Sequence, residues 1–207
     1  MCYTVNAQTP LAELVRQVKA AQAASDDYTP PGRVSGFAHP LLPVITEDDP
    51  KTIQLFKWGL IPAWAKEDKA AELAKMTLNA REDTIFEKPS FKDSIVNHRC
   101  ILLVDGFYEW RHEGKSKIPY YITLSDPKPF ALGCIYSVWK NRPTFSIVTT
   151  AANPIMEYIH NTKKRMPLML SHEEQRRWID PELTKAEIKE LMQPLDESLM
   201  KTEVIEK

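Results

Sequence analysis

The chain has 207 residues, 43% of them hydrophobic and 27% charged, which is an ordinary composition for one globular domain. Its formal net charge of −1 excludes a general attraction to nucleic acid, so any nucleic-acid site must be a local basic patch. No apolar run reaches the length of a membrane span and no signal peptide follows Met1, which predicts a cytoplasmic protein. Three widely spaced cysteines predict free thiols in a reducing compartment and no metal site.

Short strands and helices alternate in the first half of the chain. We expect a strand over residues 2–7, then a helix that Thr9 caps, with Pro10 at its first position and an end near residue 24. Two prolines interrupt residues 37–46, which predicts an irregular or edge strand. The other elements expected here are a strand over residues 52–58, a helix over 66–75 and short helices over 81–87 and 90–96.

The second half of the chain is richer in strands. An apolar run over residues 99–104 predicts a buried strand, which Asp105-Gly106 separates from another strand at 107–110. An antiparallel meander is expected from three further strands at residues 120–124, 130–139 and 144–150. The remaining expected elements are a helix over 154–160, a strand over 166–170, helices capped by Ser171 and Thr184, and a tail frayed from about residue 196.

This order of elements predicts an α+β fold. We expect a single domain over residues 1–207, with a curled, mainly antiparallel, barrel-like sheet and peripheral helices.

Cys2 directly follows the initiator methionine. Methionine aminopeptidases normally remove a methionine before so small a residue, so we expect Cys2 to carry a free α-amino group beside its thiol. Unperturbed pKa values of about 7.7–8.0 and about 8.5 leave both groups partly nucleophilic near neutrality. The amine can form an imine with an aldehyde, and the thiolate can then close a five-membered ring. The alternative is a small apolar residue that begins a strand.

Two further stretches carry candidate functional side chains. The segment 58–64 is an apolar loop with Trp58, Pro62 and Trp64, which predicts either a core plug or a stacking platform for bases. Glu109 lies between aromatic residues after a buried strand, where desolvation would raise its pKa and suit it to acid–base work. Strand alternation equally allows Glu109 to face water.

Five short motifs follow one another along residues 2 to about 175. They are Met1-Cys2, the segment 58–64, Asn79-Ala80-Arg81, the segment Asp105-Gly106-Phe107-Tyr108-Glu109-Trp110, and His160 with Arg165-Met166-Pro167. In this order they resemble the SOS response-associated peptidase (SRAP) family, which includes the abasic-site crosslinking proteins. Members link an N-terminal cysteine to the aldehyde of an abasic site in single-stranded DNA and form a thiazolidine that shields the lesion.

The resemblance implies catalytic roles for four residues and no cofactor. Cys2 would be the nucleophile, and Asn79 would orient the Cys2 terminus or the deoxyribose. Glu109 would shuttle protons, and His160 would assist sugar-ring opening or a lyase-like Schiff-base step. The family name also records an autoproteolysis that exposes the cysteine, for which removal of Met1 could substitute here.

DNA contacts are implied as well. Arg81 and Arg165 would hold phosphates flanking the lesion, while the loop with Trp58, Pro62 and Trp64 would pack against distorted DNA. A monomer is expected, associated with the nucleoid when bound to DNA.

The sequence departs from the family pattern at two places. Many members read Met-Cys-Gly-Arg, whereas Tyr3 and Thr4 stand here, which removes one expected phosphate contact. Residues 161–164 also separate His160 from Arg165, where many members have a single residue. The basic pair within this insertion either adds to the DNA groove or forms a solvated loop.

Three other functions fit parts of the sequence. Cys2 and His160, with Asn79 or Glu109, fit a thiol hydrolase acting on a peptide or amide. A nucleic-acid-binding module without chemistry would use Cys2 only structurally. A zinc protein is the weakest alternative because the His and Cys residues lack ligand spacing.

Overall fold

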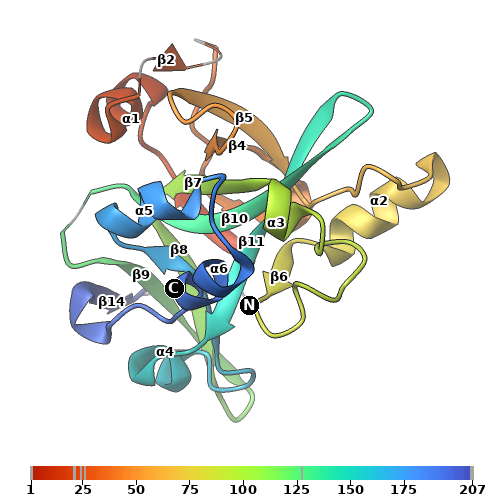
Figure 1. The fold of residues 1–207 in the computed structure, drawn as a ribbon. Helices are drawn as coiled ribbons and strands as arrows, with labels where there is room; N and C mark the ends of the chain where they lie inside the picture. The colour runs from red at the N-terminus through yellow and green to blue at the C-terminus, as the bar shows by residue number, and fades with distance from the viewer. Residues whose placement is uncertain (1, 21, 24, 26, 127, 206–207) are drawn as a thin grey trace.

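A closed barrel forms the centre of the molecule in the computed structural model, which describes residues 2–20, 22–23, 25, 27–126 and 128–205 (Figure 1). Its strands follow one another in the order β11 (Arg142–Ala151), β10 (Phe130–Trp139), β7 (Arg99–Val104), β4 (Leu41–Thr46) and β5 (Thr52–Trp58). The barrel closes because β5 also pairs in parallel with β11, with Phe145 opposite Trp58. The barrel-like α+β fold expected from the sequence is therefore confirmed.

A second sheet packs beside the barrel and carries the start of the chain. In the described part of the chain its order is β14 (Met200–Val204), β9 (Ser116–Leu124), β8 (Gly106–Glu113), β1 (Thr4–Ala7) and β3 (Gly32–Ser35). Short strands extend the barrel sheet: β2 (Gln22–Ala23), β6 (Asn79–Arg81), β12 (Arg165–Pro167) and β13 (Met169–Leu170). Chain segments far apart in the sequence thus meet around β1.

Helices cover the outside of these sheets. The α-helices are α1 (Leu11–Val18), α2 (Glu67–Met76), α3 (Ser94–Asn97), α4 (Pro154–Ile159), α5 (His172–Trp178) and α6 (Lys185–Leu191), with 3₁₀ turns η1 (Gly36–Ala38) and η2 (Glu197–Leu199). Two of the three predicted caps are confirmed, since Ser171 and Thr184 each form a reciprocal capping box. The predicted Thr9 cap is wrong, because Pro10 occupies the N-cap position of α1 and the Thr9 hydroxyl donates to Asp105 instead. Among the described helices, none combines the length and apolar character needed to cross a membrane.

Two apolar clusters lie on opposite faces of the barrel sheet. Alternation along β7 separates them: Cys100 and Leu102 face one cluster, and Ile101 and Leu103 face the other. Cys2 belongs to the first cluster, and the inner faces of α5 and α6 contribute to the second.

The first helix is shorter than predicted. It ends at Val18 because Lys19 adopts a left-handed conformation, with φ of 55°, and its N–H donates to the carbonyl of Val15. Residues 21 and 24 of the expected helix lie outside the described residues, and residues 22–23 form β2.

The edge position expected for a strand within residues 37–46 is also wrong. β4 lies between β5 and β7 in the barrel. Its ladder with β7 covers Val44 to Thr46 and begins after Pro43, so the missing N–H of the proline costs no hydrogen bond on that side.

Two expected helices and one expected strand pairing are replaced by other structure. Residues 82–93 form turns rather than helices, because Arg81 joins β6 beside β11 and only residues 94–97 become helical. The strands β9 and β10 belong to different sheets, so the predicted meander is reduced to the β10–β11 hairpin.

The tail is not frayed over residues 200–204. These residues form β14, which pairs with β9 from Met200 opposite Leu124 to Val204 opposite Tyr120. Met200 is buried against the first apolar cluster, and this anchors the strand.

Candidate active site around Cys2

Cys2 lies at the start of β1, beside the strand that carries Glu109. β1 and β8 run antiparallel with Thr4 opposite Tyr108, so the chain just before Thr4 reaches Glu109. The Cys2 side chain is fully buried, and its Sγ lies 4.0 Å from the carbonyl oxygen of Thr4. Burial and the charge of Glu109 raise the pKa of the thiol well above its ordinary value, so the thiol stays protonated at neutral pH.

Asn79 fixes the backbone of Cys2 from the other side. It begins β6, which pairs in parallel with β11, and two residues separate it from the end of α2. Its Nδ2 donates a 3.0 Å hydrogen bond to the carbonyl oxygen of Cys2. The Oδ1 of Asn79 is buried and accepts no hydrogen bond from any described residue. An acceptor beside Cys2 is therefore available to a polar hydrogen of a bound molecule.

Glu109 faces the interior rather than water. Only 5% of its surface is exposed, and burial raises its pKa from 4.5 to about 7. It lines a cavity of about 470 Å³ together with Tyr3, Trp110 and His160. A carboxyl group with a pKa near neutrality both accepts and donates a proton under physiological conditions.

His160 ends α4, a helix that Asn153 caps and Pro154 begins, as the sequence predicts. Its Nδ1 lies 2.7 Å from the carbonyl oxygen of Arg165. The N–H of Arg165 also points at Nδ1, from 3.3 Å, but the contact with the carbonyl is the shorter one. Because a carbonyl only accepts, we assign the proton to Nδ1 and the lone pair to Nε2. Burial lowers the pKa of His160 to about 4, so the ring is neutral at physiological pH.

The insertion after His160 leaves the ring in the cavity. The side chain of Asn161 accepts a 3.1 Å hydrogen bond from the N–H of His112 and donates a 2.8 Å bond to its carbonyl oxygen. These two hydrogen bonds fasten the loop of residues 161–164 to β8. Lys163 consequently lines the cavity that also contains Glu109 and His160.

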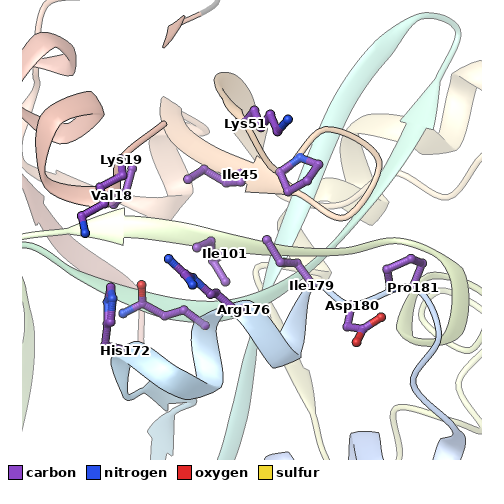
Figure 2. Close-up of a pocket in the computed structure, with 12 residues that line it drawn as sticks. Val18, Lys19, Ile45, Lys51, Ile101, His172, Arg176, Ile179, Asp180 and Pro181 are labelled. Atoms are coloured by element: carbon purple, nitrogen blue, oxygen red, sulfur yellow. The ribbon is translucent and has the colours of Figure 1, made fainter. Parts of the chain in front are cut away.

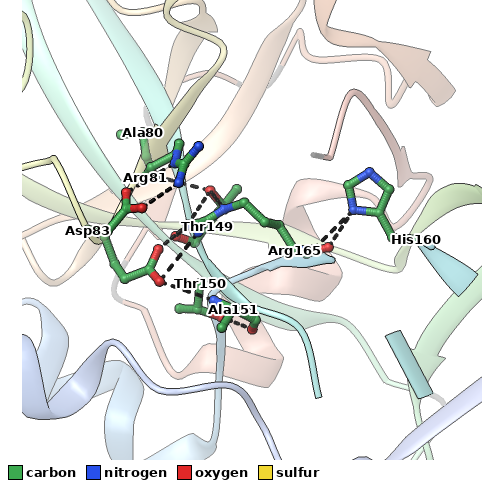
Figure 3. A network of polar contacts seen from close by, with 9 residues as sticks. Ala80, Arg81, Asp83, Thr149, Thr150, Ala151, His160 and Arg165 are labelled. Carbon is green, nitrogen blue, oxygen red and sulfur yellow. Dashed lines mark hydrogen bonds and ion pairs between the residues drawn. The ribbon is translucent and has the colours of Figure 1, made fainter. Parts of the chain in front are cut away.

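The two expected phosphate ligands have different surroundings. Arg81 pairs with Asp83, and both side chains are about half exposed, so Arg81 remains accessible to a phosphate. Arg165 is buried, pairs with Glu82 and donates to the carbonyl oxygen of Thr149 (Figure 3). Arg165 in this conformation therefore joins β12 to β11 and holds the carbonyl that binds His160.

The three expected contact residues of the loop at 58–64 also differ in their burial. Trp58 is fully buried, donates its indole N–H to the carbonyl of Leu78 at 2.8 Å and stacks on Phe145. Pro62 is also buried, whereas 61% of Trp64 is exposed. Of the three expected contact residues, the structure brings only Trp64 to the surface, and Trp58 is the core plug of the alternative interpretation.

The structure adds residues that the sequence motifs did not identify. Tyr3 lines both the cavity beside Glu109 and a second one, of about 200 Å³, beside Asn79. A third cavity, of about 390 Å³, contains Arg81 and Lys163, which also line the second and the first cavity respectively. The three cavities therefore share lining residues, and Tyr3, the neighbour of Cys2, lines two of them.

The basic residues lining the three cavities are Lys75, Arg81, Lys88, Lys117, Lys163, Lys164 and Arg165. Four of them are motif arginines or lie within the basic insertion, and so had a signal in the sequence. Lys75, Lys88 and Lys117 come from separate segments and carried no signal of their own. Among the described residues, no group of three or more His, Cys, Asp or Glu side chains is arranged to hold a metal ion.

Comparison with known proteins places this arrangement in a family. The family model described as SOS response associated peptidase (SRAP) matches residues 1–207. A crystal structure of a protein from Bacteroides thetaiotaomicron has a TM-score of 0.94 and 40% sequence identity, and the match covers 99% of this chain and 92% of that chain. The fold thus belongs to a class of barrel proteins already seen in crystals.

Relatives of known name agree with the family model. Abasic site processing protein YoqW of Bacillus subtilis (strain 168) is 38% identical over 164 residues, which cover 75% of this chain and 70% of that protein. Abasic site processing protein HMCES of Gallus gallus is 30% identical over 167 residues, which cover 68% of this chain and 49% of that protein. The chain belongs to the SRAP family.

Proposed function

We propose that this protein recognises abasic sites in single-stranded DNA and links to them covalently through Cys2 after removal of Met1. The names of its relatives support abasic-site processing as the general activity. The observation that carries the covalent step is the placement of Cys2 against Glu109 and Asn79 in a buried site. The resulting thiazolidine would shield the lesion from strand cleavage and from error-prone copying.

The pKa values favour attack by the amine before the thiol. Burial keeps the Cys2 thiol protonated, whereas a processed terminus presents an amine with an ordinary pKa of about 7.7–8.0. The amine nitrogen adds to the aldehyde carbon of the open-chain sugar, and loss of one water leaves an imine. The sulfur then bonds to the imine carbon, the thiol proton passes to the Glu109 carboxylate, and Glu109 returns this proton to the nitrogen, which becomes the ring amine.

His160 and Asn79 fit the steps around this condensation. Neutral His160 offers the lone pair on Nε2 as a base for the sugar hydroxyl proton when the deoxyribose ring opens. Asn79 holds the Cys2 carbonyl, and its Oδ1 is an acceptor for the processed terminus. The same imine is the intermediate from which a lyase-like strand cleavage would proceed.

The three cavities near Cys2 would give the DNA strand a path. Exposed Arg81 and Lys163 both line the third cavity and would contact phosphates. Trp64 would stack on a base beyond them. Arg165 acts indirectly, by supporting His160, unless DNA displaces its pairing with Glu82.

The thiol-hydrolase alternative has weaker support in the geometry. Such a mechanism activates the cysteine by a hydrogen bond to a base. Among the described residues, the polar contact of the Cys2 thiol is the carbonyl of Thr4, and its raised pKa opposes a standing thiolate. Self-processing of the terminus remains part of the proposal only if Met1 is not removed by an aminopeptidase.

The test uses an oligonucleotide with one abasic site. The purified protein, with its N-terminus checked by mass spectrometry, is incubated with the single strand and separated on a denaturing gel. We expect a heat-stable band with the wild-type protein. Cys2→Ala and Cys2→Ser both keep the α-amine but lack the thiol, so each should give a band only after borohydride reduction of the imine. Absence of any band from a protein with a free Cys2 terminus would overturn the proposal.

A further inference from the structure

A cavity of about 480 Å³ lies on the far side of the barrel sheet from Cys2 (Figure 2). Its walls are the end of α1, the turn between β4 and β5, and the helix α5 with the residues that follow it. Ile45, Ile101 and Ile179 supply an apolar floor. Ile45 and Ile101 are only 4% and 3% exposed, so these side chains are fixed by the core beneath them.

Strand alternation isolates this cavity from the Cys2 site. Ile101 points into it, whereas its neighbours Cys100 and Leu102 point into the cluster that contains Cys2. No residue lines both this cavity and any of the three around Cys2. A molecule bound here would therefore leave the proposed DNA path open.

The rim of the cavity is positively charged. Lys19 and Lys51 stand on one wall and Arg176 on the other, and all three side chains are exposed. None of the three has an ion pair among the described residues. Asp180 is the one acidic residue in the lining, so three positive charges against one negative charge leave an excess of two. The side chain of Asp180 already accepts the N–H of Glu182 at 3.0 Å.

The lining selects one kind of occupant. It contains no Phe, Tyr or Trp, and the ring that it does contain, His172, is exposed at the rim, so it offers little surface on which a nucleobase could stack. The floor has no polar group to orient a polar small molecule, and the charged rim is open to water. A peptide fits both the apolar floor and the charged rim if it places an apolar side chain against the isoleucines and carboxylates near Lys51 and Arg176. The volume suits a few side chains of an extended peptide.

We propose that this cavity docks an acidic peptide segment that carries an apolar anchor residue, supplied by a partner protein. The anchor occupies the floor between Ile45, Ile101 and Ile179, and the acidic residues pair with the cations of the rim. Docking on this face holds the protein near its partner and raises its local concentration without blocking Cys2. This inference goes beyond the proposed reaction at Cys2 and does not depend on it.

The test is a direct binding measurement on the full chain. The probe is a ten-residue peptide labelled with fluorescein, in which four aspartates precede Ile and Phe at the C-terminus. Its binding is measured by fluorescence anisotropy. We expect saturable binding that weakens about tenfold with Arg176→Glu or Lys51→Glu, because each reverses one charge pair. Lys92→Glu is the control, since Lys92 is equally exposed but lies outside the cavity. The crosslinking yield of all three variants stays at the wild-type level.

Changes in the peptide separate the two halves of the site. Replacing Ile and Phe by Ala, or the four aspartates by asparagines, should each abolish measurable binding. Single-stranded DNA at saturating concentration should not displace the peptide. The proposal is overturned if Arg176→Glu binds as the wild type does, if Lys92→Glu weakens binding equally, if the Ala peptide binds unchanged, or if DNA competes.

Discussion

Burial, more than neighbouring charge, determines the protonation of the residues around Cys2. It keeps the Cys2 thiol protonated, raises the pKa of Glu109 to about 7 and lowers the pKa of His160 to about 4. At neutral pH the site therefore holds a thiol, a half-ionised carboxyl and a neutral imidazole. Such a set can move protons in either direction, which a condensation that both gains and loses protons requires.

Glu109 is predicted to control the pH dependence of crosslinking. The carboxylate accepts the thiol proton, so the rate of the wild-type protein should rise as pH increases through about 7. Glu109→Gln should slow the reaction by a factor of about 10²–10⁴. The rate of the Glu109→Gln variant should still rise with pH, because the Cys2 amine loses its proton with a pKa of about 7.7–8.0.

The measurement for Glu109 is the single-turnover rate of band formation between pH 5 and 9. Glu113→Gln is the matched control, because Glu113 lies on the same strand but its side chain is 49% exposed. A Glu109→Gln profile identical to that of the wild type would remove Glu109 from the mechanism.

The two tryptophans of the 58–64 loop should behave in opposite ways. Trp58→Ala removes a fully buried indole and its 2.8 Å hydrogen bond, so it should lower the free energy of unfolding by about 3–5 kcal/mol. Trp64→Ala should leave stability unchanged but weaken single-stranded DNA binding by about 1–3 kcal/mol, the value of one stacked base. Urea unfolding and DNA anisotropy measure the two effects. Equal DNA affinity of Trp64→Ala and wild type would exclude stacking on Trp64.

At the scale of elements, the loop of residues 161–164 is fixed against the second sheet. Asn161 fastens it to β8 by two hydrogen bonds, and Lys164 adopts a left-handed conformation with φ of 49°. The loop thereby brings a cation, Lys163, into the lining of two cavities of the proposed DNA path.

Lys163 is predicted to contact one phosphate. Lys163→Ala should reduce the slope of log Kd against log salt by about 1, while the crosslinking rate at saturating DNA stays unchanged. Asn161→Ala should give a similar loss because the loop loses its anchor. Lys115→Ala is the control, since Lys115 is exposed at the neighbouring hairpin turn. An unchanged salt slope for Lys163→Ala would assign the loop to solvent.

Local patterns predicted the elements that are locally determined. The strands β5 and β7 and the helices capped by Ser171 and Thr184 follow from apolar runs and cap residues within the segment itself. The elements that depend on distant partners were missed. β6 exists because β11 runs beside it, and β14 exists because β9 offers an open edge.

The same distinction applies to the site. The motifs identified Cys2, Asn79, Glu109 and His160, and the structure places Asn79 against Cys2, and Glu109 beside His160 in one cavity. The motifs did not separate accessible side chains from buried ones. Arg165 pairs with Glu82, and Trp58 stacks on Phe145. Both partners come from other segments, so the burial of Arg165 and Trp58 cannot be read from any single stretch of the sequence.

At the scale of the whole molecule, the barrel sheet separates the candidate site at Cys2 from the proposed peptide cavity. One face holds the Cys2 site, and the other holds helix α5 and the proposed peptide cavity. Arg99, a buried residue of β7, connects the sheet to this second face. Its guanidinium donates to carbonyls at the end of α5 and in α3, and pairs with Glu47 at 2.8 Å.

Arg99 is predicted to be a major determinant of stability. Arg99→Met keeps much of the side-chain volume but leaves Glu47 buried without its partner and several carbonyls without donors, so we expect a loss of about 3–5 kcal/mol. Glu47→Gln should cost less, because the arginine keeps its carbonyl partners. If Arg99 and Glu47 act as one unit, the double variant should lose less free energy of unfolding than the two single variants lose in sum. Urea unfolding of the three variants measures this coupling. Additive losses would show that Arg99 and Glu47 are not a coupled unit, and that Arg99 stabilises the end of α5 through its hydrogen bonds to the carbonyls of Trp178 and Asp180 without help from Glu47.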